Sequence, residues 1–133
     1  MYSDIYNIKA NIEKSKPATN EIIEDTQKQL GIFFGKEYRE FLKEFGCLSV
    51  EYLEFYGICG SNSSAPNMLY VTLKFREEMP SFSKELIVIY EVGEGSFYCV
   101  DKNDKIYLCN YDNCQRVDKT FREFLYEKVG ELQ

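Results

Sequence analysis

The spacing of apolar residues changes after Gly46, and this change limits the possible folds more than any other feature of the sequence. Before Gly46, a stripe of apolar side chains recurs at the helical positions i, i+3, i+4 and i+7: Tyr38, Phe41, Leu42 and Phe45. After it, apolar and polar residues alternate from Leu48 onward, which is typical of a strand with one buried face. A helical first third followed by strands predicts the α+β fold class.

Two further helices are expected in the first third of the chain. A short one precedes Pro17 and carries isoleucines at helical spacing: Ile5, Ile8 and Ile12. The second is expected to begin at Thr19, whose hydroxyl can cap the first turn, and to end at Gly31, which can adopt the left-handed conformation. The first third is therefore predicted to be mainly helical.

The remainder of the chain is predicted to contain strands and a closing helix. The strands are expected at residues 48–58, 85–92, 97–101 and 106–110. A loop is expected at residues 60–67, and Gly93-Glu94-Gly95 has the composition of a hairpin turn. The last helix is expected to have Asp118 as its cap and to end at Gly130. The predicted architecture is one layer of helices on a mostly antiparallel sheet, in a single domain over residues 1–133.

Charge and composition exclude several classes of function. With 22 acidic and 16 basic residues, the chain has a formal net charge of −6. Such a surface repels phosphates and anionic lipids, so we expect neither nucleic acid nor membrane as a partner. Histidine is absent, which removes the commonest general base and a common metal ligand. The acids Asp101, Asp104 and Asp112 also lack the spacing of a calcium-binding loop. We therefore predict no catalytic residue, no metal site and no cofactor.

The five cysteines are not arranged as a disulfide framework or as a zinc knuckle. Their number is odd, and no two of them form a Cys-x-x-Cys pair: Cys47, Cys59, Cys99, Cys109 and Cys114. We therefore expect reduced thiols that are mostly buried. The sequence has no basic, apolar leader and no apolar run of about 18 residues, so a soluble, cytoplasmic protein is expected.

Four blocks of sequence, in the order found here, resemble the SUKH superfamily, which includes the yeast Smi/Knr cell-wall regulators and many bacterial immunity proteins. The blocks span nearly the whole chain and lie at residues 21–46, 55–58, 86–101 and 120–125. They contain the glycines that end the early helices, the aromatic-glycine pair Tyr56-Gly57 and the Gly93-Glu94-Gly95 turn. The chain departs from the family pattern in two places. Phe34-Gly35 stands where a Leu-Pro pair is usual, and Cys47 replaces a frequent glycine.

The resemblance implies a helix from Asn67 to Glu78, where the local pattern alone slightly favours a strand. It also implies binding without catalysis: an antidote that blocks the toxic domain of a polymorphic toxin. Such domains are frequently nucleases with basic surfaces, which an acidic inhibitor could cover directly. The expected partner is therefore a cognate, basic protein toxin. The alternative that the resemblance leaves open is a regulatory protein-interaction scaffold of the Smi/Knr type.

Two acidic stretches indicate where a basic partner would bind. Residues 85–101 contain four acidic residues, and residues 51–73 contain two. Neither range contains a Lys or an Arg. If the strands are neighbours, the two stretches form one negative surface with tyrosines between the acids. A tyrosine ring beside a carboxylate suits lysine or arginine, through cation–π contact and a charged hydrogen bond. The predicted partner-binding residues are Glu51, Glu54, Tyr56, Glu91, Glu94, Tyr98 and Asp101.

Within this set, three acids are expected at the centre of the surface: Glu91, Glu94 and Asp101. Tyr56 and Tyr98 are expected to act as anchors, because tyrosine is enriched at protein interfaces. The alternative interpretation is that the acids are ordinary solvated groups and that the tyrosines belong to the core. The relative placement of the strands decides between these two interpretations.

Overall fold

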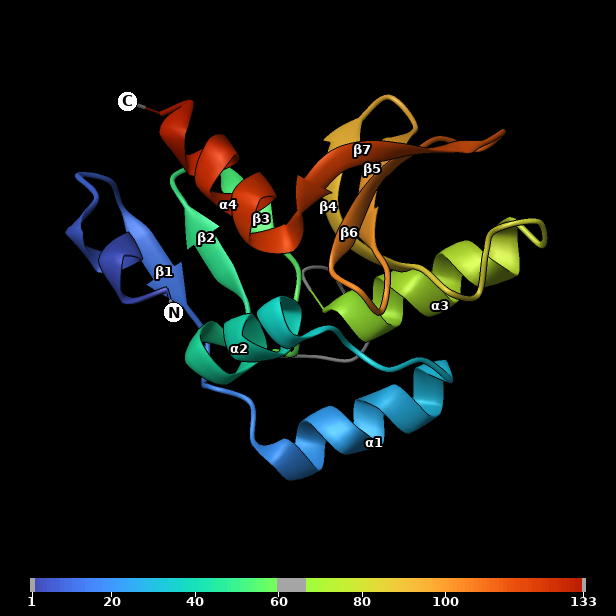
Figure 1. Cartoon of the computed structure of the whole chain (residues 1–133), viewed down its shortest axis with the longest axis horizontal. Coiled ribbons are helices and arrows are strands. Elements are labelled where there is room, and N and C mark those ends of the chain that lie inside the picture. The colour runs from blue at the N-terminus through green and yellow to red at the C-terminus, as the bar shows by residue number, and fades with distance from the viewer. Residues whose placement is uncertain (1, 60–66, 133) are drawn as a thin grey trace.

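The fold is described by a computed structural model, which covers residues 2–59 and 67–132 (Figure 1). Except for Asn67, the predicted loop at 60–67 lies outside the described residues. The elements in chain order are the 3₁₀ helix η1 (Ser3–Asn7), β1 (Ile12–Lys14), α1 (Asn20–Leu30), α2 (Lys36–Phe45), β2 (Leu48–Val50), β3 (Leu53–Phe55), α3 (Met68–Glu78), β4 (Ile87–Gly93), β5 (Ser96–Val100), β6 (Lys105–Cys109), β7 (Cys114–Thr120) and α4 (Phe121–Gly130). The predicted α+β class is confirmed.

The described strands form two antiparallel sheets. One has the order β1-β2-β3 and the other the order β4-β5-β6-β7. A backbone hydrogen bond joins them, because the N–H of Tyr56 donates to the carbonyl of Ile89 over 2.8 Å. The segment after β3 therefore lies beside β4, which is the neighbour relationship that a shared acidic surface requires.

Two strand predictions are corrected. The single strand expected at 48–58 is a hairpin, because Glu51 has a φ of 54° and turns the chain between β2 and β3. The meander has a fourth strand, β7, which was not predicted from the sequence. Most side chains of β7 are exposed, so its sequence lacks the apolar alternation that marks a strand. The Gly93-Glu94-Gly95 turn is confirmed, with positive φ at all three residues.

Helices pack on both faces of the four-stranded sheet. Successive side chains on a strand point to opposite faces. The ring of Phe97 on β5 lies 4.5 Å from Phe75 of α3, and the ring of Tyr98 lies 4.7 Å from Phe124 of α4, measured between ring centroids. The sheet is therefore sandwiched between α3 and α4, and Figure 1 shows these two helices on different sides of it.

The N-terminal segment differs from the expected helix. It forms a single 3₁₀ turn over η1 and then the edge strand β1, in which Ile12 pairs with Val50 of β2. The helical spacing of the isoleucines predicted that they share one face of a helix. In the structure Ile5 is buried, whereas Ile12 lies in the sheet and is only half-buried. Pairing with β2 gives the backbone of β1 hydrogen-bond partners, whereas a short isolated helix is only marginally stable.

The ends of the helices follow from local chemistry. Thr19 caps α1 and Gly31 ends it with a φ of 70°, as predicted. The helix implied by the resemblance at 67–78 is confirmed as α3, and the Asn67 side chain accepts a hydrogen bond from the Tyr70 N–H. The predicted cap of the last helix is wrong. Asp118 belongs to β7, and Thr120 caps α4 in a reciprocal pair with Glu123.

Two glycines of the family blocks, Gly46 and Gly57, allow two backbone segments to lie close together. A side chain at Gly57 would overlap the carbonyl of Gly46, and the N–H of Ile58 donates to that carbonyl over 2.9 Å. Gly46 itself has a φ of 72°, which glycine adopts without strain. The end of α2 and the end of β3 are therefore held in contact by residues that carry no side chain.

Candidate functional site

The junction between β3 and β4 brings three of the predicted partner-binding residues together. Glu54 on β3 and Glu91 on β4 are exposed, whereas Tyr56 between them is only 5% exposed. Burial raises the pKa of Tyr56 far above its usual value, and the nearby carboxylates of Glu91 and Glu54 add to this shift. We call Glu54, Tyr56 and Glu91 the β3–β4 patch.

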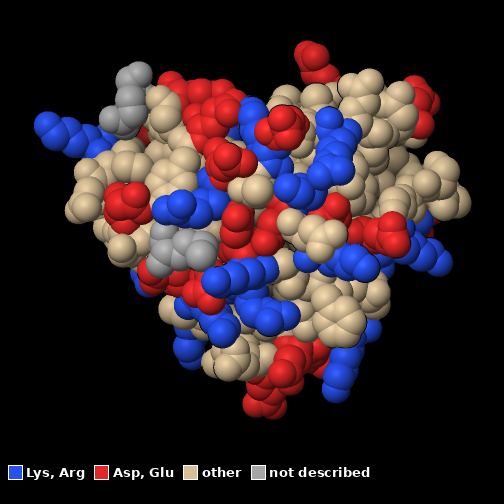
Figure 2. Space-filling model, viewed as in Figure 1, with Lys and Arg blue, Asp and Glu red and all other residues tan. Residues whose placement is uncertain are grey.

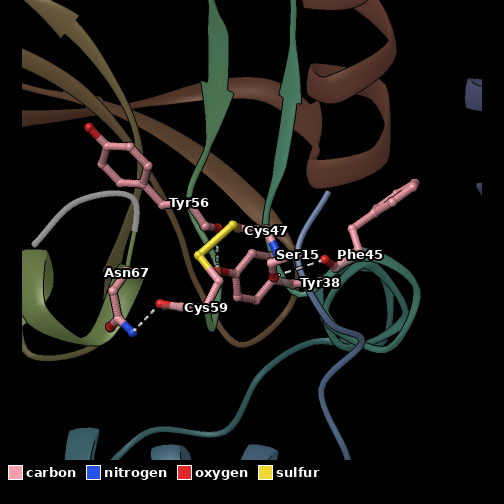
Figure 3. The surroundings of a disulfide bond; sticks show 7 residues. All are labelled: Ser15, Tyr38, Phe45, Cys47, Tyr56, Cys59 and Asn67. Atoms are coloured by element: carbon pink, nitrogen blue, oxygen red, sulfur yellow. Dashed lines mark hydrogen bonds between the residues drawn. A yellow bond between two sulfur atoms is a disulfide. The ribbon is translucent and has the colours of Figure 1, made fainter. Parts of the chain in front are cut away.

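The backbone at the patch is fixed from three directions. The Tyr56 N–H donates to Ile89 of β4, and its carbonyl accepts a hydrogen bond of 2.8 Å from the buried hydroxyl of Tyr38 in α2. Three residues further on, Cys59 is joined to Cys47 at the end of α2 by a disulfide bond. Figure 3 shows the Tyr56 ring directed away from this disulfide. The patch is therefore built on rigid backbone.

The disulfide region is also tied to the chain on both sides (Figure 3). The Cys47 N–H donates to the Ser15 hydroxyl over 3.2 Å, and that hydroxyl donates to the carbonyl of Phe45. The Asn67 side chain donates to the carbonyl of Cys59 over 3.1 Å. The strand end that carries Tyr56 is thus held against both α2 and the start of α3.

The expectation of reduced thiols is wrong for four of the five cysteines. Cys47 pairs with Cys59, and Cys109 pairs with Cys114 across the β6–β7 hairpin. Only Cys99 is free, and burial raises the pKa of its thiol well above the ordinary value. Spacing along the chain gave no signal for either bond, because both depend on how the strands and helix ends meet.

Glu51 lies away from the β3–β4 patch and has a structural role. It occupies the turn between β2 and β3, where its carboxylate accepts a hydrogen bond of 2.9 Å from the N–H of Asn11. Its own N–H donates to the Asn11 carbonyl over 2.8 Å. This reciprocal pair holds the segment before β1 against the β2–β3 turn.

Tyr98 faces α4, where a lysine of the same chain already covers it. The Nζ of Lys128 lies 5.4 Å from the centroid of the Tyr98 ring and 5.7 Å from that of Tyr90. The predicted chemistry of a cation over a tyrosine is present, but the cation comes from α4. Lys128 was not predicted as a neighbour of Tyr98, because it lies about thirty residues further along the chain and no local signal links the two residues.

The other two acids of the predicted centre lie at opposite ends of β5. Glu94 is exposed at the β4–β5 turn, and Asp101 follows the last residue of the strand. The Asp101 carboxylate accepts hydrogen bonds from the N–H groups of Asn103 and Lys105 and from the Tyr107 hydroxyl, at 2.8 to 3.0 Å. The structure therefore does not bring Asp101 to the β3–β4 patch, and its side chain orders a turn.

The face seen in Figure 2 is not uniformly acidic. Acidic and basic side chains are interspersed across it, and several basic ones gather in the region where Figure 1 places α1 and α2. The prediction of a single negative face with all seven residues is therefore wrong. The structure has a smaller cluster of three of them at the β3–β4 junction.

Sequence reasoning also missed a groove between α1 and α2. Its volume is about 660 Å³, and it is lined by Asn20, Ile23, Glu24, Gln27, Lys28, Gly31, Ile32, Phe33, Arg39 and Lys43. The signal that could have found it is a run of cations without acidic neighbours on the facing sides of two helices. Acidic and basic residues are mixed along residues 20–45, so this signal is not visible in the sequence. The packing of α1 on α2 determines which of these charges face each other.

Within the described residues, no three His, Cys, Asp or Glu side chains are placed to hold a metal ion together. The described helices are also too short or too polar for any of them to cross a lipid bilayer.

A family model of the SUKH group, SUKH_5, described as SMI1-KNR4 cell-wall, matches residues 3–130. No curated protein gives a significant match. The family match covers every element from η1 to α4, including both glycines of the α2–β3 contact. This chain belongs to the SUKH superfamily, in its SMI1-KNR4 family.

Proposed function

We propose that this protein is an immunity protein, which binds a basic toxin domain and blocks it without any turnover of its own. The SUKH superfamily consists of immunity and interaction proteins without catalytic activity, and membership in it supports a binding role for this chain. The net charge of −6 favours association with a cationic partner through electrostatic steering.

The β3–β4 patch is the observation that carries this proposal. Glu54 and Glu91 are exposed, and neither forms an ion pair with a basic side chain in the described part of the chain. Their charges are therefore available to a lysine or arginine of a partner. Tyr56 is almost fully buried between them and donates a side-chain hydrogen bond to Glu91, so it supports the patch from within the core.

The test begins with co-expression. The partner to be tested is the C-terminal domain of a large secreted protein encoded beside this gene, and the measurements are rescue of growth and co-purification in a fixed ratio. If the wild-type protein neither rescues growth nor co-purifies, the immunity function is refuted. A partner that binds without being toxic would instead indicate a regulatory scaffold.

The surface is tested by reversing charge at the patch. We expect Glu54→Lys/Glu91→Lys to slow association with the toxin domain about tenfold or more and to reduce its salt dependence. The matched control is Glu77→Lys/Glu78→Lys, which changes the net charge equally on two exposed residues at the end of α3. Equal effects of the two double variants would show that net charge matters and the patch does not.

A further inference from the structure

The groove between α1 and α2 differs in charge from the rest of the protein. It is lined by three basic side chains, Lys28, Arg39 and Lys43, and by a single acid, Glu24. In the part of the chain that the structure describes, none of these three cations forms an ion pair with a carboxylate. The charged side chains of the lining therefore give the groove a net positive charge, in a protein whose net charge is −6.

Arg39 is held in place by a neutral group. The side-chain carbonyl of Gln27, which is buried in α1, accepts hydrogen bonds from Arg39 Nη2 over 3.2 Å and from the Phe34 N–H over 2.8 Å. The Nε of Arg39 is buried and has no hydrogen-bond partner among the described residues. Gln27 thus orients the guanidinium without neutralising its positive charge, which lines the groove.

The groove also offers apolar surface. Ile23 and Ile32 line it, and Phe33 at its rim is 72% exposed. These three side chains give the groove an apolar side next to its cations. The volume of about 660 Å³ lies within the range of pockets that bind small molecules.

We propose that this groove is a second docking site, which takes an acidic peptide segment of a partner protein that carries an apolar side chain beside its carboxylates. The three cations would bind the carboxylates, and Phe33 with Ile32 would contact the apolar side chain. Nucleic acid is a poor occupant, because a polyanion that extends beyond the groove would meet the net negative charge of the protein. In Figure 1, α1 lies at the opposite edge of the molecule from α4 and β3, so the two surfaces can be occupied at once.

The experiment uses random twelve-residue peptides displayed on phage and selected on the immobilised full-length protein. We expect the selected peptides to contain acidic residues next to Phe, Leu or Ile. The best peptide, labelled with fluorescein, is then titrated by fluorescence anisotropy. Lys28→Gln/Lys43→Gln should weaken its binding at least tenfold, and Phe33→Ser should weaken it severalfold. All three residues are exposed, so these variants should fold.

The matched control is Lys9→Gln/Lys102→Gln, which removes two exposed charges outside the groove and should change binding less than twofold. Selected peptides without acidic residues, or acidic peptides that bind both double variants equally, would overturn the proposal. Displacement of the peptide by equimolar single-stranded dT12 would assign the groove to nucleic acid. A dimer of the wild-type protein that Lys28→Gln/Lys43→Gln dissociates would assign it to a second copy of the chain.

Discussion

The carboxylate of Asp104 lies over Gly35, in the space that a side chain at residue 35 would occupy. It accepts hydrogen bonds from the N–H groups of Glu37 and Tyr38, at 2.9 and 3.1 Å, and so caps the first turn of α2 from a distant part of the chain. The carbonyl of Asp104 also accepts a hydrogen bond from the N–H of Phe121 at the start of α4. One residue of the β5–β6 turn thus connects the starts of two helices.

Gly35→Ala should therefore destabilise the protein. The added methyl group would overlap the Asp104 carboxylate, so we expect the free energy of unfolding to fall by about 1–3 kcal/mol. Urea denaturation measures this change. The control is Gly130→Ala at the end of α4, where a methyl group meets no atom and stability should stay equal or rise slightly. An unchanged free energy of unfolding for Gly35→Ala would contradict the contact.

A double-mutant cycle isolates the relationship between the two residues. Asp104→Ala alone should cost about 0.5–2 kcal/mol, because α2 loses its cap. In the Asp104→Ala background the carboxylate is gone, so Gly35→Ala should cost much less than in the wild type. Strictly additive effects would show that the methyl group does not meet Asp104.

The stability contributed by Asp104 should depend on pH. Burial raises the pKa of Asp104, and the charges of Glu37 and Asp101 add to this effect, against the hydrogen bonds from the Glu37 and Tyr38 backbone. A carboxyl whose folded-state pKa is raised binds protons better in the folded protein, so its contribution is fully present below the unfolded pKa and is lost as pH rises through the folded value.

The measurement compares wild type with Asp104→Asn by urea denaturation at several values between about pH 3 and 6. The difference in the free energy of unfolding, wild type minus variant, should fall with rising pH in the range just above the ordinary Asp pKa of 3.8. A difference that rises with pH would mean that the backbone hydrogen bonds outweigh burial.

Thiol titration should report the disulfide pairing. For oxidised protein, Ellman's reagent should detect no reactive thiol in the native state, because Cys99 is buried with a raised pKa. It should detect one thiol after denaturation and five after denaturation with reduction. Three or more thiols in the denatured, unreduced protein would contradict one of the two bonds.

The two disulfides should differ in their effect on stability. Cys47 and Cys59 are 12 residues apart, so Cys47→Ala/Cys59→Ala should lower the free energy of unfolding by about 3 kcal/mol. Cys109 and Cys114 are 5 residues apart, so removing their bond should cost about 2 kcal/mol. Thermal and urea unfolding under oxidising conditions measure both variants, with reduced wild type as the control.

Tyr126 should titrate late because it interacts with Asp4. Burial, with the hydrogen bond to the Asp4 carboxylate, raises the pKa of Tyr126 to about 12. Its neutral form is therefore favoured in the folded state, and the stability it contributes is lost as pH rises from 10 toward 12. Asp4→Asn should lower this pKa in a ring ¹³C NMR titration. An identical titration curve in Asp4→Asn would exclude the interaction.

The elements that local pattern predicted well are those whose signals lie within a few residues. The stripe of α2, the Thr19 cap, the Gly31 stop and the Gly93-Glu94-Gly95 turn each depend on neighbouring residues, and the structure contains all four. The β2–β3 turn was missed because Glu51 adopts a positive φ that its residue type seldom adopts. In the candidate site, sequence grouped seven residues by charge along the chain, but the sheet brings only three of them together.

By itself, the sequence determined the helices α1, α2 and α4, the three strands β4 to β6, the absence of histidine chemistry and the net negative charge, because these depend on composition and on spacing within single elements. Only the tertiary structure decided which charges meet. It placed Lys128 over Tyr98, Asp104 over Gly35, and three unpaired cations around one groove. Each of these contacts joins residues on different elements, and their positions follow from how helices and sheets pack, which no local pattern encodes.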